Sequence, residues 1–562
     1  MAQTVSAQEH AAAFSNKMRS LALVIVAFAF VMDLLDTTIV NVAIPSIQAS
    51  LHASYGAIQW IVAGYSLTFA LLLVTGGRMG DVYGYKKLFL FGVAGFTAAS
   101  LLDGLSVNAG MLIASRLLQG AFAALMVPQV MSLMQVMYKP EERGKINGLF
   151  GALGGLSASL GPVLGGLLLK WNIAGLDWRP LFLINIPVGL FAFGMGMKYL
   201  PKGKSPHPLK LDLVGTGIIV ATMLLIVFPL IQGREYGWPA WSFAMLLAAI
   251  PGLAVFIWWQ KKKEKIDGSP LVLPSLFRNR SFSTGLALNL LFELVMVGFF
   301  LTLTLVLQIG FGYTPIHSAL TGLPIAFAIA ITMATMGEKV IPKLGRKSFN
   351  ISAVLMALGV VLTGAVMVHY GIAVHSWQFI PSLVLFGVGM GFGFGSLFAA
   401  VLNGVDSGHA GSASGTLNAI QQIGGAIGVA VIGVIFFGHL SASAAQSFAQ
   451  AEPQLRQQLT GAHIPAQAQD RIIAGTKACY VDRAKAKDPS QTPESCKALQ
   501  NSDAGSALGK DIQATVLKAN ADNFAHAFRS GAVYSVAVLA MVFGLTFLLP
   551  KQFKAEAYKE AV

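Results

Sequence analysis

Long apolar runs recur along almost the whole chain, each near the length that crosses a bilayer as a helix. A membrane-spanning helix needs about 20 predominantly apolar residues. Only 11% of the 562 residues are charged, whereas a soluble protein carries about 25%. The predicted fold class is therefore an all-α polytopic membrane protein. Fourteen runs qualify, at 20–43, 56–76, 87–104, 110–132, 146–168, 181–200, 212–231, 241–260, 284–308, 317–337, 349–368, 379–401, 415–437 and 530–549.

Lysine and arginine are distributed unevenly among the loops between these runs. With the N-terminus placed inside, nearly all loop cations are cytoplasmic, and the short outer loops hold only Lys170, Arg179 and Arg234. Because positive loops stay on the cytoplasmic side, we expect a multi-pass protein of the cell membrane with both termini in the cytoplasm. The net charge of +14 is then an orientation signal. We therefore expect the lipid bilayer, and no nucleic acid, among its partners.

One long polar segment, residues 438–528, is predicted to lie outside. Two stretches of it, 446–453 and 510–518, are predicted to be helical and modestly amphipathic. The segment contains both cysteines of the chain, Cys479 and Cys496. A disulfide between them is expected because the outer compartment is oxidising; two free thiols are the alternative. Two cysteines without a nearby histidine pair predict no metal site.

A weak internal repeat indicates how the runs are grouped. The loops 77–87 and 337–347 match when Gly84 is aligned with Gly345, which suggests two six-helix halves separated by an inserted pair of helices. Paired repeats of this kind build many secondary transporters. The predicted division is a cytoplasmic tail at 1–19, a first bundle at 20–200, inserted helices and a linker at 201–280, a second bundle at 281–549 that includes the outer loop 438–528, and a cytoplasmic tail at 550–562.

Four charged residues lie well inside predicted spans, namely Asp33, Asp36, Arg116 and Glu293, and Asp103 lies near the outer end of its span. A charge at membrane depth costs several kcal/mol, so it needs a partner, water or a proton. Asp33 and Asp36 share one helical face because they are three residues apart. All four are predicted to take part in proton coupling; a structural ion pair is the alternative for the aspartates. Glu293 can equally bind a cationic substrate or be a protonated acid hydrogen-bonded between helices.

Five sequence motifs resemble those of one transporter family. They are Leu35–Pro45 with Asp36 and Asn41, Gly77–Lys87, Arg116–Gly120, Gly155–Gly166, and Trp178–Pro187. Together they resemble the major facilitator superfamily, and within it the fourteen-helix drug/proton antiporter branch of EmrB/QacA type. The resemblance implies two six-helix bundles plus two inserted helices. It also favours Asp36 over Asp33 as the proton site, since Asp36 lies inside the first motif and at a depth compatible with Arg116.

Two of these motifs have a mechanical interpretation. For the motif Gly77–Lys87, the resemblance implies a conformational latch at the cytoplasmic face, formed by Gly77, Asp81, Gly84, Lys86 and Lys87. A solvated turn is the alternative. The second is the antiporter motif of the fifth span, in which small residues permit a bend and close packing around a proline. Its residues are Gly155, Gly161, Pro162, Gly165 and Gly166.

These features predict a proton-coupled exporter, an antiporter of amphipathic, cationic or aromatic drugs that works by alternating access, not an enzyme. No Walker loop is present, so we expect no cofactor and the proton gradient as the energy source. The alternatives are an exporter of a specific metabolite (sugar, siderophore or antibiotic), or a lipid-moving or scaffold protein that uses the outer loop. A periplasmic adaptor bound to this loop is implied by the resemblance alone. Candidate substrate-cavity residues are Trp60, Tyr65, Phe292, Gln308, Gln421 and Gln422.

Overall fold

The computed structural model describes residues 16–553 apart from 139, 206–208, 338–339, 404, 406–409, 486–492 and 497–506, and all regular structure in this part is helical. Each of the fourteen predicted spans coincides with helical structure, apart from one residue at some ends and a turn at Ile184 within the sixth, which confirms the predicted fold class. Thirteen helices are long and apolar enough to cross a membrane, and α6 adds the shorter apolar stretch Leu160–Trp171. The main helices are α2 Asn16–Leu51, α3 Tyr55–Tyr83, α4 Tyr85–Gly104, α5 Ala109–Met137, α6 Pro140–Trp171, α7 Pro180–Leu183, α8 Asn185–Tyr199, α9 Leu213–Glu235, α10 Ala240–Asp267, α11 Arg280–Leu305, α12 Pro315–Met336, α13 Ile341–Leu344, α14 Lys347–Tyr370, α15 Ser376–Leu402, α16 Ala410–Gly461, α17 Ala466–Lys485 and α19 Ala507–Leu545.

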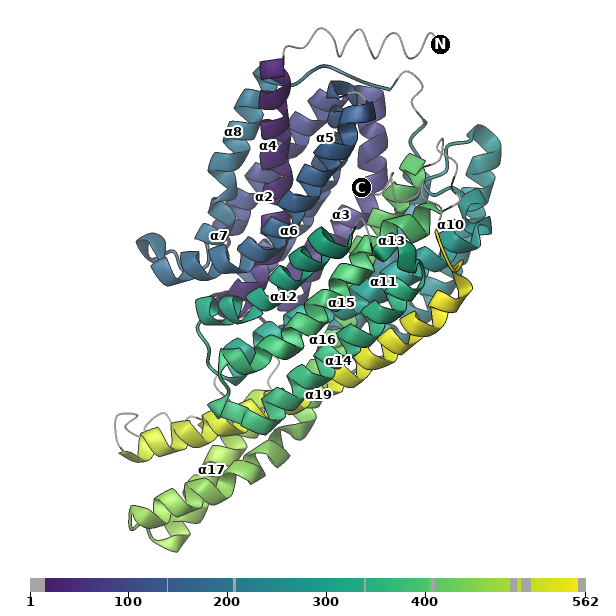
Figure 1. The fold of residues 1–562 in the computed structure, drawn as a ribbon. Helices are drawn as coiled ribbons and strands as arrows, with labels where there is room; N and C mark the ends of the chain where they lie inside the picture. The colour runs from purple at the N-terminus through teal and green to yellow at the C-terminus, as the bar shows by residue number, and fades with distance from the viewer. Residues whose placement is uncertain are drawn as a thin grey trace, which may run out of the picture.

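The helices form two groups that lie side by side (Figure 1). In the first group, α3 and α4 pack on α5, while α2 packs on α6 and α8. In the second, α11 packs on α16, α14 on α15 and α19, and α12 on α15. We call the side where α2 begins the N-side, and the opposite side, where α17 lies, the loop side.

The two groups touch each other near the loop side. Gln308 Nε2, in the short π-helical turn Val306–Gly310 after α11, donates a 3.2 Å hydrogen bond to the carbonyl of Val42 in α2. The rings of Tyr55 in α3 and Phe437 in α16 lie 4.1 Å apart. Packing between α6 and α12 adds a further contact. The groups are therefore joined where the polar segment begins.

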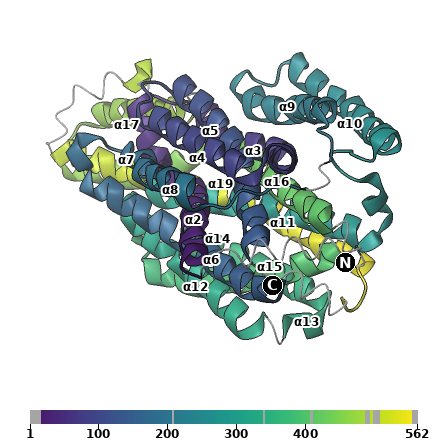
Figure 2. The same cartoon turned by 90° about the horizontal axis from the view of Figure 1, so that it is seen from above.

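The inserted helices α9 and α10 lie at one edge of the molecule, on the side of α3 (Figure 2). The buried guanidinium of Arg78 in α3 donates to the carbonyls of Lys210, Ser269 and Pro270. Asp212 caps α9 by accepting from the Gly215 N–H at 2.9 Å. The Arg78 bonds fasten the segment before α9 and the segment after α10 to the first group.

The carboxyl of Asp212 is stabilised in its charged form. Burial acts to raise its pKa, but hydrogen bonds from Trp259 Nε1 (2.8 Å), Gln260 Nε2 (2.9 Å) and two backbone N–H groups outweigh burial and hold the pKa below its ordinary value. Since the pKa is depressed, the ionised carboxylate contributes stability at neutral pH, and this contribution is lost on acidification.

The polar segment 438–528 is a folded helical extension of the second group. Spans α16 and α19 continue past the bilayer length, and α17 packs on α16 (Figure 1). Apolar side chains of the three helices form a separate core that includes Phe448, Leu455, Ile473 and Tyr480. Cys479 and Cys496 form a disulfide there. The two predicted helical stretches lie in α16 and α19.

The internal repeat is visible in the backbone. Gly84 precedes α4 with a φ of 101°, and Gly345 precedes α14 with a φ of 55°. Both are left-handed conformations that favour glycine. The aligned glycines of the two loops thus both have a positive φ just before corresponding helices. The domain boundaries drawn from the repeat remain a prediction.

Candidate functional site

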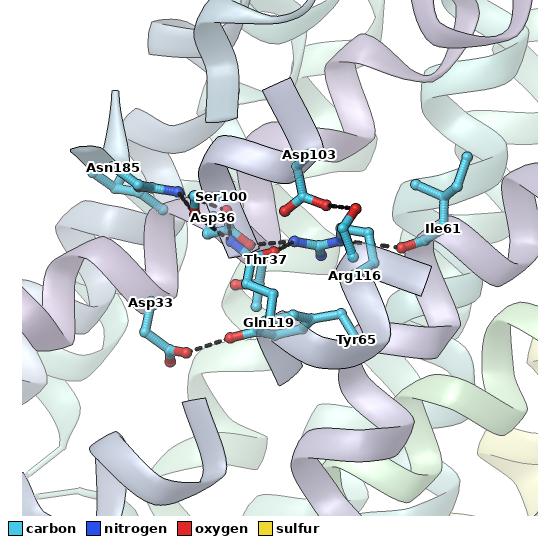
Figure 3. Close-up of polar contacts among 12 residues, drawn as sticks. Asp33, Asp36, Thr37, Ile61, Tyr65, Ser100, Asp103, Arg116, Gln119 and Asn185 are labelled. Atoms are coloured by element: carbon cyan, nitrogen blue, oxygen red, sulfur yellow. Dashed lines mark hydrogen bonds and ion pairs between the residues drawn. The ribbon is translucent and has the colours of Figure 1, made fainter. Parts of the chain in front are cut away.

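A cluster of polar side chains lies buried inside the first group of helices (Figure 3). Each member comes from an apolar helix and none is more than 3% exposed. Asp33 and Asp36 lie on the same side of α2 because they are three residues apart. This side faces the inside of the first group. The other members are Tyr65 from α3, Ser100 and Asp103 from α4, Ser115, Arg116 and Gln119 from α5, and Asn185 from α8.

Asp36 is the centre of this cluster. Its Oδ2 forms an ion pair with the Arg116 guanidinium, and its Oδ1 accepts from Gln119 Nε2 at 2.9 Å and Asn185 Nδ2 at 2.8 Å. Arg116 also donates to Gln119 Oε1 and, from Nε at 3.3 Å, to the carbonyl of Ile61. The Asp36 carboxylate therefore has a cation and two amide donors, as a buried charge requires.

Ser100 fixes the orientation of the two amides. Its hydroxyl oxygen accepts from Gln119 Nε2 at 2.7 Å and from Asn185 Nδ2 at 3.1 Å. Both amides consequently present N–H groups to Asp36 as well as to Ser100. A hydrogen-bonded network of this kind holds the Asp36–Arg116 pair in one geometry.

Asp33 has a different environment from Asp36, one turn away. Among the described residues, its hydrogen-bond partner is the Tyr65 hydroxyl, which donates to Oδ1. The ring of Tyr65 in turn lies under the Arg116 guanidinium, 4.3 Å from its carbon to the ring centroid. Tyr65 thus links Asp33, which has no cation partner in the described structure, to the Asp36–Arg116 pair.

Glu293 is the buried acid of the second group. It lies in α11, is 3% exposed, and its Oε1 has no hydrogen-bond partner among the described residues. Helix α16 passes close beside it: a Cβ placed on Gly424 would be 2.9 Å from Glu293 Cβ. Gln421, one turn earlier in α16, interacts with the carboxyl. Glu293 is therefore a buried acid next to an amide, and no described residue forms an ion pair with it.

The latch motif is held within the first group in this state. Asp81 accepts a 3.0 Å hydrogen bond from the Tyr85 hydroxyl, and Gly77 packs on Pro128 of α5. Lys86 Nζ donates at 2.8 Å to two carbonyls at the end of α8, those of Met197 and Leu200, as a cation at a helix C-terminus does. Its other two members are Gly84, which makes the turn described above, and the exposed Lys87.

The antiporter motif forms close contacts between helices. A side chain at Gly161 would collide with Thr38 of α2, and one at Gly165 would lie 2.9 Å from Ile39 Cγ1. Gly166 faces the other group: a Cβ there would be 2.7 Å from the Ile316 Cα of α12. Gly155 and Pro162 belong to the same helix α6.

The remaining predicted cavity residues are dispersed. Trp60 packs against Phe228 of α9, at 6.1 Å between ring centroids. It therefore contacts the inserted pair of helices. Phe292 packs edge-on against Phe394 of α15. Gln308 connects the two groups, as described above, and Gln422 is half-buried beside Gln421.

Five members of the cluster were absent from the predicted site: Ser100, Asp103, Ser115, Gln119 and Asn185. Gln119 belongs to the motif Arg116–Gly120, one turn from Arg116, and Asn185 belongs to the motif Trp178–Pro187. Ser100 has no sequence signal beyond its place in an apolar run. A polar residue in each of two further spans is the signal that points to a network. No group of three or more His, Cys, Asp or Glu side chains in the described residues is arranged to hold a metal ion.

The helical architecture defines the class of protein, a multi-pass membrane protein with charged side chains buried between its helices. The profile described as Major Facilitator Superfamily matches residues 26–429, and the chain belongs to this superfamily. It is 39% identical over 535 residues to a Streptomyces coelicolor protein named "Probable actinorhodin transporter", covering 95% of this chain and 92% of that one.

A second relative and a solved structure agree with this assignment. The "Tetracenomycin C resistance and export protein" of Streptomyces glaucescens is 32% identical over 420 residues, which is 74% of this chain and 75% of that protein. The crystal structure of an inward-facing, unoccupied bacterial homologue of the human lysosomal transporter Spinster has a TM-score of 0.60 at 15% identity. It covers 96% of this chain and 100% of that chain, and this likeness shows the fold.

Proposed function

We propose that the chain is a proton-coupled antiporter that exports amphipathic, cationic or aromatic small molecules by alternating access. Two kinds of support combine: relatives whose names refer to transport of, or resistance to and export of, antibiotics, and a buried acid that is free to exchange a proton. The single observation on which the coupling rests is the environment of Asp33, which is buried among apolar helices with the neutral phenol of Tyr65 as its hydrogen-bond partner in the described structure. A carboxyl in such a place is most stable when it is protonated.

The geometry favours Asp33 over Asp36 as the group that binds and releases the proton. Asp36 already has a cation and two amide donors, so its charge is compensated. Asp33 lacks a cation but is linked to Arg116 through Tyr65. We infer that the Asp36–Arg116 pair sets the electrostatic field in which Asp33 titrates.

The N-side is proposed to face the cytoplasm, since the loops on that side hold most of the lysines and arginines. The loop-side contacts between the groups then close the outer face. Release of protons and uptake of substrate would occur on the cytoplasmic side. The helical extension would project outward, and an adaptor protein of the periplasm would bind to it there.

The direct experiment uses purified protein in liposomes. Transport of ethidium, a cation, and of Nile red, a neutral aromatic dye, is measured with and without an imposed pH gradient. We expect dye movement against its gradient only when protons flow the opposite way, and its loss on addition of a protonophore. Dye movement that is indifferent to the pH gradient and to the protonophore would contradict the proposal.

Export of one specific antibiotic is the second candidate function. It is favoured by the 39% identity over almost the full length to a protein named for a single compound. The dye panel separates the two functions: a multidrug exporter moves several unrelated dyes, whereas a dedicated exporter moves none of them and still dissipates a pH gradient when its own compound is supplied.

Glu293→Gln is expected to affect cationic dyes most. A charged hydrogen-bond partner contributes about 1.5–3 kcal/mol, so ethidium transport should fall about tenfold or more while Nile red transport changes little. Asp470→Asn, at an exposed acid of the extension, is the control and should alter neither rate. Equal losses for both dyes would instead assign Glu293 to proton binding.

Gly166→Val is expected to disfavour the state in which the loop side is closed. The new side chain would collide with the backbone of Ile316 in α12, and overpacking costs about 1–3 kcal/mol, which is about a tenfold or larger change in population. Transport should slow accordingly, while thermal unfolding of the protein changes little. Gly194→Val is the matched control because no described atom outside its own stretch of helix lies within 4 Å of its Cβ position. Equal rates for the two variants would exclude a role of this contact in the transport cycle.

A further inference from the structure

We propose that Asp103 is a second proton-binding carboxyl of the cluster, so that the first group of helices holds two exchangeable protons in this conformation, one on Asp33 and one on Asp103. The inference rests on the proposed antiport and specifies how many protons its first site can bind. Asp103 lies in the last turn of α4 and is fully buried. Its role does not follow from any of the motifs.

The hydrogen bonds of Asp103 suit a protonated acid. Its Oδ1 lies 2.5 Å from Ser115 Oγ, and its Oδ2 has no partner in the described structure. Ser115 Oγ also lies 3.0 Å from the carbonyls of Met111 and Leu112. With a proton on Asp103, its O–H donates to Ser115 Oγ and the serine hydroxyl donates to one of these carbonyls. The unpartnered Oδ2 is then the oxygen of a neutral carbonyl. Burying it without a hydrogen bond costs far less free energy than burying a charged carboxylate oxygen.

The charges around the cluster lead to the same conclusion. The acids are Asp33 and Asp36 from α2 and Asp103 from α4, and the cation among the described cluster residues is Arg116 from α5. Tyr65 from α3 and Asn185 from α8 add no charge. Just before α7, Arg179 donates to the carbonyl of Ser106 and stacks on Trp178. With all three acids ionised, the cluster would carry a net charge of minus two that no other described member of it balances.

Two protons remove this imbalance. Arg116 is paired with Asp36, so the protons belong on the two acids without a cation. Arg116 also interacts electrostatically with Asp103. Figure 3 shows the carboxyls of Asp36 and Asp103 on different sides of its guanidinium. When Asp103 releases its proton, Arg116 can stabilise the new carboxylate together with that of Asp36. The cluster therefore has a place for a second negative charge during the cycle.

The first test measures protonation directly and does not require transport. Infrared difference spectra of the purified protein, titrated from acid to alkaline pH, report the C=O stretch of protonated carboxyls. We expect Asp103→Asn to remove one buried carboxylic-acid component and to release one proton fewer per protein. Asp470→Asn, at an exposed acid, is the control and should leave that component unchanged. An unaltered spectrum and proton count in Asp103→Asn would overturn the proposal.

A second variant protects this test against misfolding of Asp103→Asn. Ser115→Ala retains the acid but removes its hydrogen-bond partner, so the carboxylic-acid band should shift without losing intensity; an unshifted band would also overturn the proposal. In liposomes, Asp103→Asn should export ethidium with one proton fewer per dye, and an unchanged ratio would count against it. Failure of the wild type to couple dye to protons would instead refute the proposed function, because the infrared count does not depend on transport.

Discussion

Asp33→Asn should abolish proton-driven accumulation of dye, reducing it to the level of protein-free liposomes, while the folded protein persists. Asparagine has nearly the same shape, and its Oδ1 still accepts the hydrogen bond that Tyr65 donates to Asp33. The substitution removes the buried titratable group and leaves the Asp36–Arg116 pair intact. The measurement is ethidium accumulation in liposomes under an imposed pH gradient.

Exchange transport distinguishes loss of coupling from loss of binding. Exchange of labelled for unlabelled dye across the membrane requires no net proton movement, so Asp33→Asn should retain it. Asp33→Glu, which restores a carboxyl, should recover part of the accumulation. Accumulation at the wild-type level in Asp33→Asn would remove Asp33 from the coupling mechanism and return the role to Asp36.

The spans could be predicted from sequence because each depends on a local property. An apolar run near bilayer length must be helical, since lipid offers no other partner for its backbone. The fold of the helical extension was harder to predict, because no such local property determines it. The continuations of α16 and α19 beyond the bilayer are polar on one face, and the core they share with α17, which includes Phe448, Tyr480 and Ala519, comes from parts of the chain that are distant in sequence.

The acids of the site could be found by sequence, but their different roles could not. Hydropathy identifies Asp33, Asp36 and Arg116 as costly residues, and periodicity places the aspartates on one face. Which of them meets the guanidinium depends on the rotation of α2 against α5, 80 residues away. Asn185 comes from α8, 149 residues from Asp36. Pairing between helices is a property of packing, and no local pattern encodes it.

Arg116→Leu should be the most destabilising substitution in the cluster, and its effect should depend on Asp36. Removing the guanidinium leaves a carboxylate buried without a cation, which costs about 3–5 kcal/mol. The double variant Asp36→Asn/Arg116→Leu removes both charges and should recover much of this stability. Thermal unfolding of the wild type, both single variants and the double variant completes a cycle in which we expect strong coupling. The exposed pair Arg456 and Asp470, with N and O 2.8 Å apart, provides the matched cycle and should show almost no coupling because solvent screens its charges.

Transport by the same four proteins tests what the Asp36–Arg116 pair is for. If the pair sets the field around Asp33, the double variant regains stability but not proton-driven export, since Tyr65 then has no guanidinium over its ring. If the pair only holds α2 against α5, export should return together with stability. Recovery of both in the double variant would therefore reduce the pair to a structural role. Additive unfolding effects, with no coupling between the two residues, would contradict the ion pair itself.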